Sequence, residues 1–274
     1  MIRISIALTI SSIAFTAGAA SGEGDERAQP DTSVREVPQS SANEAAASGA
    51  LSPFSVSPRV PHAANAITLG GYDTASRDFR ARGTLDGRLT SFLAARVEYE
   101  HGPANGPDDR VSLGLRAMFL NQAAHGVDVG ALAFYQPRDF REEGNVVGGL
   151  LVARRFDKLT LVLNPLLGSD PEGDDRSFEL RFAGMYRANS WLVVGLDSRG
   201  RYNLSSDQKR AGHFGIDWEA QAGASTAFGL GPLLISTLVG PSFLQRTFME
   251  LDGGPGERQL RPGLLAMAGA GASF

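Results

Sequence analysis

The sequence has 274 residues, 33 glycines, no cysteine and a formal net charge of −4. Without cysteine the chain has no disulfide, no thiol chemistry and no lipid-modified N-terminal cysteine, and its mild acidity counts against a nucleic-acid partner. The many glycines suit turns and closely packed strands and count against a helical protein.

The beginning of the chain has the pattern of a secretory signal peptide over residues 1–20. Arg3 precedes an apolar run at 4–17, and small residues at 17–20 offer a cleavage site. The run is short for a transmembrane helix, but an N-terminal anchor helix is the alternative. Residues 21–62 are rich in Ala, Ser, Glu and Pro, with few large apolar side chains, so we expect them to be disordered.

Residues 63–274 contain alternating apolar and polar residues, the pattern of β-strands. The clearest example begins at residue 177, where Leu180 and Phe182 alternate with Glu179 and Arg181. Each such run lasts about ten residues, the length of a tilted strand that crosses a bilayer. In chain order the expected strands cover residues 67–74, 78–86, 91–99, 110–120, 127–135, 146–156, 159–167, 177–187, 191–204, 214–228, 232–244 and 264–274.

The connections between these strands alternate between short turns and long polar segments. The short ones are 87–90, 121–126, 157–158, 188–190 and 229–231, and the long ones are 100–109, 136–144, 168–176, 205–212 and 245–259. Short turns at one end of the strands and long loops at the other end are typical of an outer-membrane barrel. The sequence therefore predicts an all-β, closed up-and-down transmembrane barrel of 12 antiparallel strands, or 10 if its first strand is not formed. A soluble β-sandwich with buried apolar faces is the alternative.

In such a barrel the apolar faces meet lipid and the charged faces line the lumen. We therefore expect the following side chains to point inward: Arg80, Arg82, Asp86, Arg96, Glu98, Arg116, Asp128, Arg154, Glu179, Arg181, Asp197, Arg199, Arg201, Asp217 and Glu219. Burying these charges is costly unless they are paired or hydrated. They could form a salt-bridged plug that rigidifies a narrow barrel, or line a hydrated pore whose transverse field selects small solutes.

The last strand has apolar residues at alternate positions and ends in phenylalanine: Leu264, Ala266, Ala268, Ala270, Ala272 and Phe274. This segment resembles the C-terminal signal that the outer-membrane barrel-assembly machinery reads, although alanine replaces the larger apolar residues usual there. The run 168–174, followed by Glu179, Arg181 and Tyr186, also resembles uncharacterised, porin-like outer-membrane barrels of Gram-negative bacteria. This resemblance covers about residues 64–274 and implies a fold and a compartment but no activity.

Residues that could support catalysis or metal binding do not form a recognisable arrangement. His62, His101, His125 and His213 make no paired-histidine motif, so no metal site or cofactor is expected. The chain also lacks the His-x-Ser dyad of outer-membrane phospholipases and the acidic and histidine residues of omptin-like proteases. An acidic cluster at Asp170, Glu172, Asp174 and Asp175 lacks EF-hand spacing and reads as a solvated loop. We expect no enzyme.

The resulting hypothesis is a barrel exported to the outer membrane of a Gram-negative bacterium, in contact with membrane lipid. The leading function is a small passive, porin-like channel for small solutes. The alternative is a non-conducting structural or surface-interaction barrel, with its acidic loops as contact sites.

Overall fold

The computed structural model describes residues 52–102, 110–137, 144–171, 176–204, 215–248 and 257–273. The chain divides into two units, Met1–Val37 and Pro38–Phe274, and the described residues belong to the second. The expected signal peptide, residues 21–51 and Phe274 lie outside the described residues, so the cleavage site and the assembly signal stay predictions. No helix in the described ranges is both long and apolar enough to cross a membrane.

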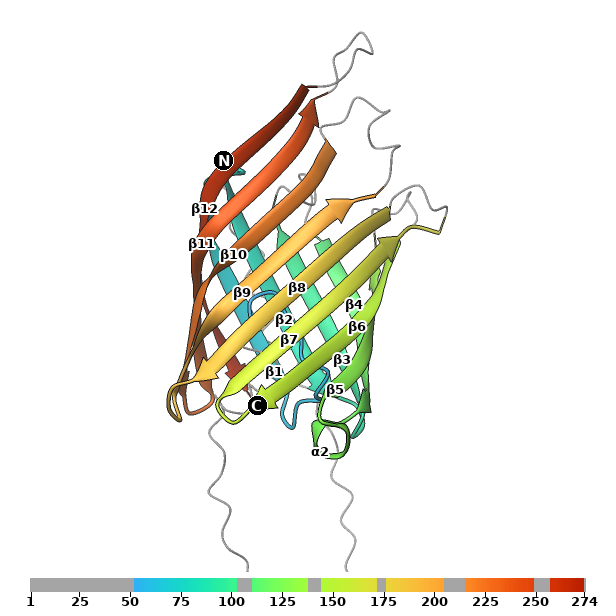
Figure 1. Ribbon diagram of the computed structural model, residues 1–274, viewed down its shortest axis with the longest axis vertical. Helices are drawn as coiled ribbons and strands as arrows, with labels where there is room; N and C mark the ends of the chain where they lie inside the picture. Colours follow the sequence, from blue (N-terminus) through green and yellow to red (C-terminus); the bar gives the residue numbers. More distant parts are fainter. Residues whose placement is uncertain are drawn as a thin grey trace, which may run out of the picture. The chain divides into compact units, whose positions relative to one another are not determined.

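Twelve antiparallel strands form one closed barrel, in which sequence neighbours pair and the first strand pairs with the last (Figure 1). The strands are β1 (Asn65–Asp73), β2 (Asp78–Arg88), β3 (Leu93–His101), β4 (Arg110–Leu120), β5 (Asp128–Gln136), β6 (Asn145–Phe156), β7 (Leu159–Ser169), β8 (Arg176–Arg187), β9 (Leu192–Asn203), β10 (Gly215–Leu230), β11 (Leu233–Phe248) and β12 (Glu257–Ser273). This confirms the predicted fold with 12 strands. The 10-strand alternative fails because β1 pairs along its whole length with both β2 and β12.

Two connections differ from the predicted loops. The ladder between β11 and β12 continues to the pair Phe248↔Glu257, so much of the predicted loop at 245–259 is strand. The connection between β4 and β5 contains a short helix, α2 (Gln122–His125). The side chain of Asn121 caps this helix by accepting a hydrogen bond from the N–H of Ala124, and Gly126 ends it with a φ of 75°.

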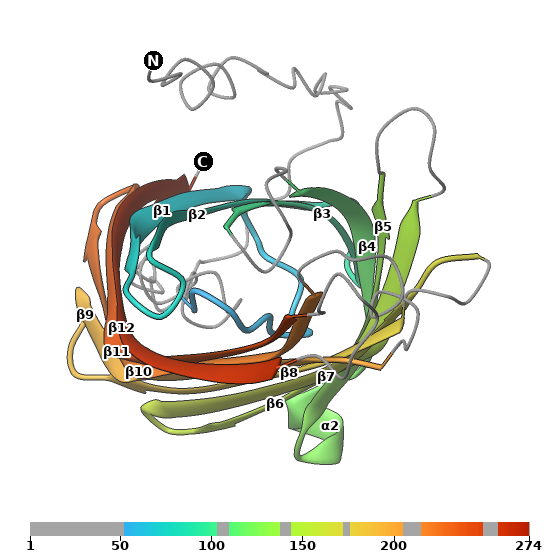
Figure 2. The same cartoon turned by 90° about the horizontal axis from the view of Figure 1, so that it is seen from above.

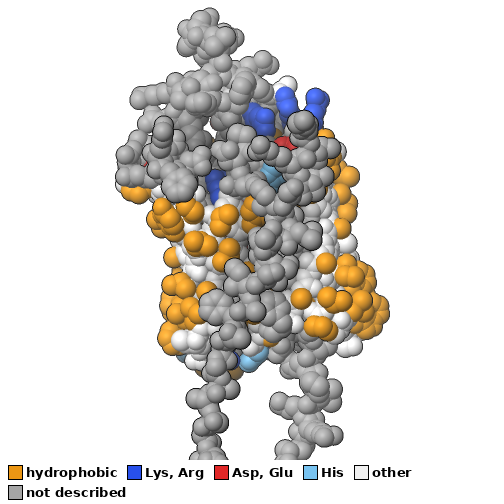
Figure 3. All heavy atoms as spheres, turned by 180° about the vertical axis from the view of Figure 1, so that it is seen from behind, with side chains coloured by type: hydrophobic (Ala, Val, Ile, Leu, Met, Phe, Trp, Pro, Cys, Tyr) orange, Lys and Arg blue, Asp and Glu red, His pale blue; other side chains and the backbone are white. Residues whose placement is uncertain are grey.

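The outer wall of the barrel is apolar. On β8 and β9 the outward residues Phe182, Tyr186, Leu196 and Tyr202 are all exposed, and the inward residues between them are mostly buried. Figure 3 shows apolar side chains spread over the wall. Soluble proteins rarely expose so much contiguous apolar surface, whereas a barrel in lipid requires it. The soluble sandwich is therefore wrong: one closed sheet turns its apolar face outward.

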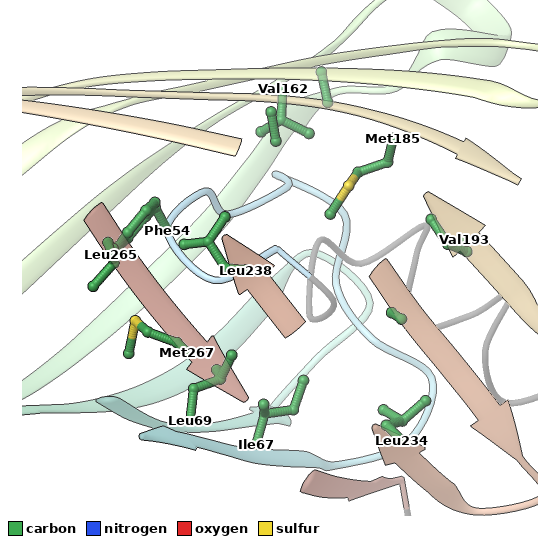
Figure 4. Close-up of a cluster of buried hydrophobic side chains, with 13 residues drawn as sticks. Phe54, Ile67, Leu69, Val162, Met185, Val193, Leu234, Leu238, Leu265 and Met267 are labelled. Atoms are coloured by element: carbon green, nitrogen blue, oxygen red, sulfur yellow. The ribbon is translucent and has the colours of Figure 1, made fainter. Parts of the chain in front are cut away.

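The interior has two parts that follow from the order of residues along the inward faces. We call the end with the Asp157-Lys158 turn the short-turn end, and the opposite end the long-connection end. One part is an apolar cluster between Phe54 and the inner wall of β1 and β6–β12 (Figure 4); it includes Phe54, Ile67, Leu69, Val162, Met185, Val193, Leu234, Leu238, Leu265 and Met267. Charged side chains line the inner wall of β2–β4 along most of its length, from Arg80 and Arg82 near the long-connection end to Asp86, Arg96 and Arg116 near the short-turn end.

The disorder predicted for residues 21–62 does not extend to 52–62. These residues run inside the barrel, as the blue trace in Figure 2 shows. Every residue from Ser52 to Pro58 is buried, including Phe54 at 3% and Val56 at 1% exposure. The prediction rested on the average composition of 42 residues, in which two large apolar side chains carry little weight. Phe54 and Val56 nevertheless suffice to order this short segment, because the barrel wall provides the apolar surroundings in which they are buried.

Candidate functional site in the barrel lumen

The inward-facing charges predicted from the sequence are placed by the two-residue period of each strand. Eleven of them are buried: Arg80, Arg82, Asp86, Arg96, Glu98, Arg116, Asp128, Arg181, Asp197, Arg199 and Glu219. Glu179, Arg201 and Asp217 share the inward alternation of their strands and are partly buried. The inner wall is thus strongly charged over much of the barrel.

Arg154 is the exception. Leu151 and Ala153 on β6 are buried, so Arg154 points outward, where it is exposed and its guanidinium lies 4.6 Å from the centre of the Phe156 ring. The prediction of an inward Arg154 is wrong because β6 is apolar on both faces. The alternation of apolar and polar residues therefore could not show which of Arg154 and Arg155, near the end of this strand, faces inward.

One set of ion pairs runs along the wall formed by β2, β3 and β4. Arg96 pairs with Asp86 at 3.1 Å and with Glu98 at 2.7 Å. Arg116 also reaches Asp86, at 2.8 Å, and Arg82 reaches Glu98 at 2.9 Å. Each of these arginines is at most 3% exposed, so pairing offsets a desolvation cost that would otherwise be several kcal/mol per ion.

A second set of ion pairs crosses the lumen. Arg199 on β9 pairs with Glu100 on β3, and these strands lie six positions apart in both directions around the barrel. Arg181 on β8 reaches Glu98 on β3 at 3.4 Å. We call these two contacts the cross-lumen bridge.

Arg80 makes a related connection between β2 and two acidic residues. It pairs with Asp73 on the neighbouring strand β1 at 2.8 Å and also with Glu219 on β10. On β8, Glu179 joins Arg181 at 2.6 Å and Arg199 of β9 at 2.8 Å. Glu179 and Glu98 therefore join the second set to the first in one network across the lumen, and Arg80 adds a link from β2 to β10.

Sequence reasoning missed Glu100, which stands in the expected connection 100–109, and Asp73, which stands near the end of the expected strand 67–74. Extending the alternation of Arg96 and Glu98 by one step would have placed Glu100 inward. Asn164 on β7 was missed too, although it is fully buried at 0% exposure on the inner wall. A polar residue on an otherwise apolar strand, LTLVLNPLLGS, is the signal that could have found it.

Several inner-wall polar atoms have no hydrogen-bond partner among the described residues. They include Asn65 Oδ1 on β1, Asn145 Oδ1 on β6 and Ser236 Oγ on β11. Buried polar atoms are normally hydrogen-bonded to protein or to water. Water would satisfy such atoms wherever it enters the lumen.

No family model and no curated protein matches the chain. Among solved structures the fold is similar to the NanC porin, with a TM-score of 0.52 and 10% identity over 76% of this chain and 99% of that one. It is likewise similar to the KdgM porin, with a TM-score of 0.52 and 8% identity over 77% of this chain and 99% of that one. The chain has the fold of these two barrels. At such low identities the similarity establishes the fold alone and leaves the function to this chain's own residues.

Proposed function

We propose that this porin-like barrel lies in the outer membrane of a Gram-negative bacterium and gives small hydrophilic solutes a passive route through its lumen. The observation that carries the proposal is the network of charged side chains on the inner wall of a closed barrel with an apolar exterior. Polar lumen walls and lipid-facing apolar walls together are typical of channels of this architecture.

The charged side chains are not needed merely to pack the interior of the barrel. An apolar cluster already packs part of the interior, and replacing buried ion pairs by well-packed apolar residues is often neutral or stabilising. Arginines and carboxylates on facing walls instead create a transverse field, which orients and selects hydrated solutes. The inner-wall polar atoms without protein partners support the presence of water there.

A second candidate is a non-conducting structural or surface-interaction barrel. The cross-lumen bridge and the apolar cluster favour it, because both occupy the space that a solute would need. Most of the acidic loop that could act as a contact site lies outside the described residues, which leave out 172–175.

Conductance in planar lipid bilayers decides between these candidates. The refolded full-length chain should give discrete ohmic steps, and the reversal potential in a salt gradient should move when Glu219 is replaced by Gln. A preparation that is folded, as shown by different gel mobility of boiled and unboiled samples, but gives no steps at any voltage would support the non-conducting barrel.

A further inference from the structure

Residues 52–58, Ser-Pro-Phe-Ser-Val-Ser-Pro, form a segment that we call the lumen segment. All seven residues are buried inside the barrel, yet none belongs to a strand. The barrel closes without them, since β1 pairs with β12 over nine residues. The lumen segment therefore needs its own explanation, which lies in how the wall contacts it.

The wall recognises the backbone of the lumen segment. The side-chain amide of Asn164 on β7 accepts a hydrogen bond from the N–H of Val56 at 2.7 Å and donates one to the carbonyl of Val56 at 2.8 Å. Asn164 thus satisfies both backbone groups of one residue, as a neighbouring strand would do. Such a two-point contact binds the backbone of one residue whatever its side chain is.

Two arginines add further backbone contacts. Arg181 on β8 donates to the carbonyl of Phe54 at 3.1 Å, and Arg116 on β4 donates to the carbonyl of Ser57. Arg181 also belongs to the cross-lumen bridge. The same side chain therefore holds both the lumen segment and the contact between opposite walls.

Asp197 on β9 accepts hydrogen bonds from residues near the N-terminal end of the lumen segment. Its carboxylate is 1% exposed and receives hydrogen bonds from the hydroxyl of Ser52 and from the N–H of Phe54 at 3.2 Å. The hydroxyl of Ser55 lies 3.5 Å from the second carboxylate oxygen. A buried carboxylate is costly without donors, and here the lumen segment supplies them.

Two apolar sites receive the two large side chains. Phe54 lies in the apolar cluster with Leu238 and Leu265 (Figure 4), with the guanidinium of Arg82 5.8 Å from the centre of its ring. Val56 lies in a second cluster, which contains Leu132, Phe134, Leu151 and Leu166. Alternate side chains in separate apolar sites, with the backbone held between them, are typical of bound extended peptides.

We propose that the inner wall is a peptide-binding site, and that its ligand is the lumen segment, which acts as a releasable plug. The contacts come from four separate strands and leave the barrel ladder unchanged, so the segment can leave without breaking strand pairing. Its release withdraws Phe54 from the apolar cluster and a partner from Arg181. The consequence for solute passage rests on the proposed function, but the binding of the segment does not.

Thiol accessibility tests the proposal in the full-length chain. Because the sequence has no cysteine, Ser55→Cys introduces one thiol in the segment, at a position that is 0% exposed. The protein is refolded into lipid vesicles and treated with a water-soluble maleimide. Labelling is compared with that of Ser225→Cys, which is a buried position on the wall strand β10.

Two further substitutions weaken the binding of the segment to the wall, one in the segment and one in the wall. Val56→Pro removes the N–H that donates a hydrogen bond to Asn164, and it leaves the sequence of the barrel strands unchanged. Asn164→Ala removes the side chain on the wall that binds the backbone of Val56. Each should speed labelling of the Ser55→Cys thiol about tenfold, which is what the loss of one or two net hydrogen bonds allows. His62→Ala is the control, because this exposed side chain lies outside the lumen segment, and it should leave the rate unchanged.

The outcomes separate this proposal from the proposed channel. Faster labelling at position 55, with position 225 lagging behind it and the folded gel mobility retained, supports a releasable plug. Equal slow labelling in all variants overturns it and makes the segment part of the folded core. Equal fast labelling at 55 and 225 also overturns it, since the whole barrel then opens. Conductance measured on the same variants tests the channel separately, so a plug that is released without any conductance contradicts the channel alone.

Discussion

Arg199 on β9 and Glu100 on β3 join opposite walls of the barrel through a two-point ion pair. The two terminal guanidinium nitrogens of Arg199 donate to the two carboxylate oxygens of Glu100, at 2.9 and 3.2 Å. Parallel bonds of this kind fix the relative position of both groups as well as contributing energy. A contact between residues 99 positions apart in the sequence therefore spans the lumen at this level.

The first prediction concerns this pair. Arg199→Ala and Glu100→Ala should each destabilise the barrel more than the double variant does, because each single change leaves the other buried charge with only its second partner, Arg82 for Glu100 or Glu179 for Arg199. We expect a coupling energy of about 1–3 kcal/mol from the double-mutant cycle, measured by urea unfolding in lipid vesicles. The double variant should also conduct more than the original protein. A coupling energy near zero would mean that water already screens the pair.

The second prediction concerns the seam that closes the barrel. A Cβ on Gly269 of β12 would collide with the backbone of Thr68 and Leu69 on β1. Gly269→Ala should therefore cost about 1–3 kcal/mol, as overpacking in a fixed structure does. The measurement is the fraction of unboiled protein with folded gel mobility. Gly200→Ala on β9 is the control, because nothing lies within 4 Å of a Cβ there; equal losses in both variants would contradict the argument.

The third prediction tests the lipid-facing wall. Leu196 is exposed at 63% near the middle of β9, and Leu230 is exposed at 59% at the end of β10, beside a turn. An arginine at the centre of the bilayer costs about 2–4 kcal/mol and one near the interface about 0–1 kcal/mol. Leu196→Arg should thus destabilise the folded barrel in vesicles far more than Leu230→Arg. Similar small effects at both sites would place Leu196 in water.

The fourth prediction follows from the outward position of Arg154. Because this side chain lies outside the lumen, Arg154→Ala should leave single-channel conductance and ion selectivity unchanged. Losing the contact with the Phe156 ring should reduce stability by about 0.5–1 kcal/mol. Arg116→Ala is the comparison, since Arg116 is fully buried inside the lumen and its loss should alter selectivity. A change of ion selectivity in Arg154→Ala would contradict the outward position and indicate that this side chain faces the lumen.

The sequence predicted the barrel well because its signals are local. Alternation on β8 put Glu179 and Arg181 on one face and Phe182 on the other, and the structure has the same arrangement. The pattern failed at Arg154, where both faces of β6 are apolar. It also ended the third strand at residue 99, two residues before β3 ends, because the end of a strand is set by its partner across the ladder: Glu100 pairs with Arg110.

The sequence by itself determined the closed antiparallel barrel, the outward apolar face and the identity of most inward charges. These features repeat every two residues, so neighbouring positions are enough to reveal them. Only the tertiary structure decided that Arg199 meets Glu100 across the lumen, and that residues 52–58 lie inside with Asn164 and Asp197 as partners. Such contacts depend on the diameter of the barrel and on residues more than 90 positions apart, for which a period along one chain carries no information.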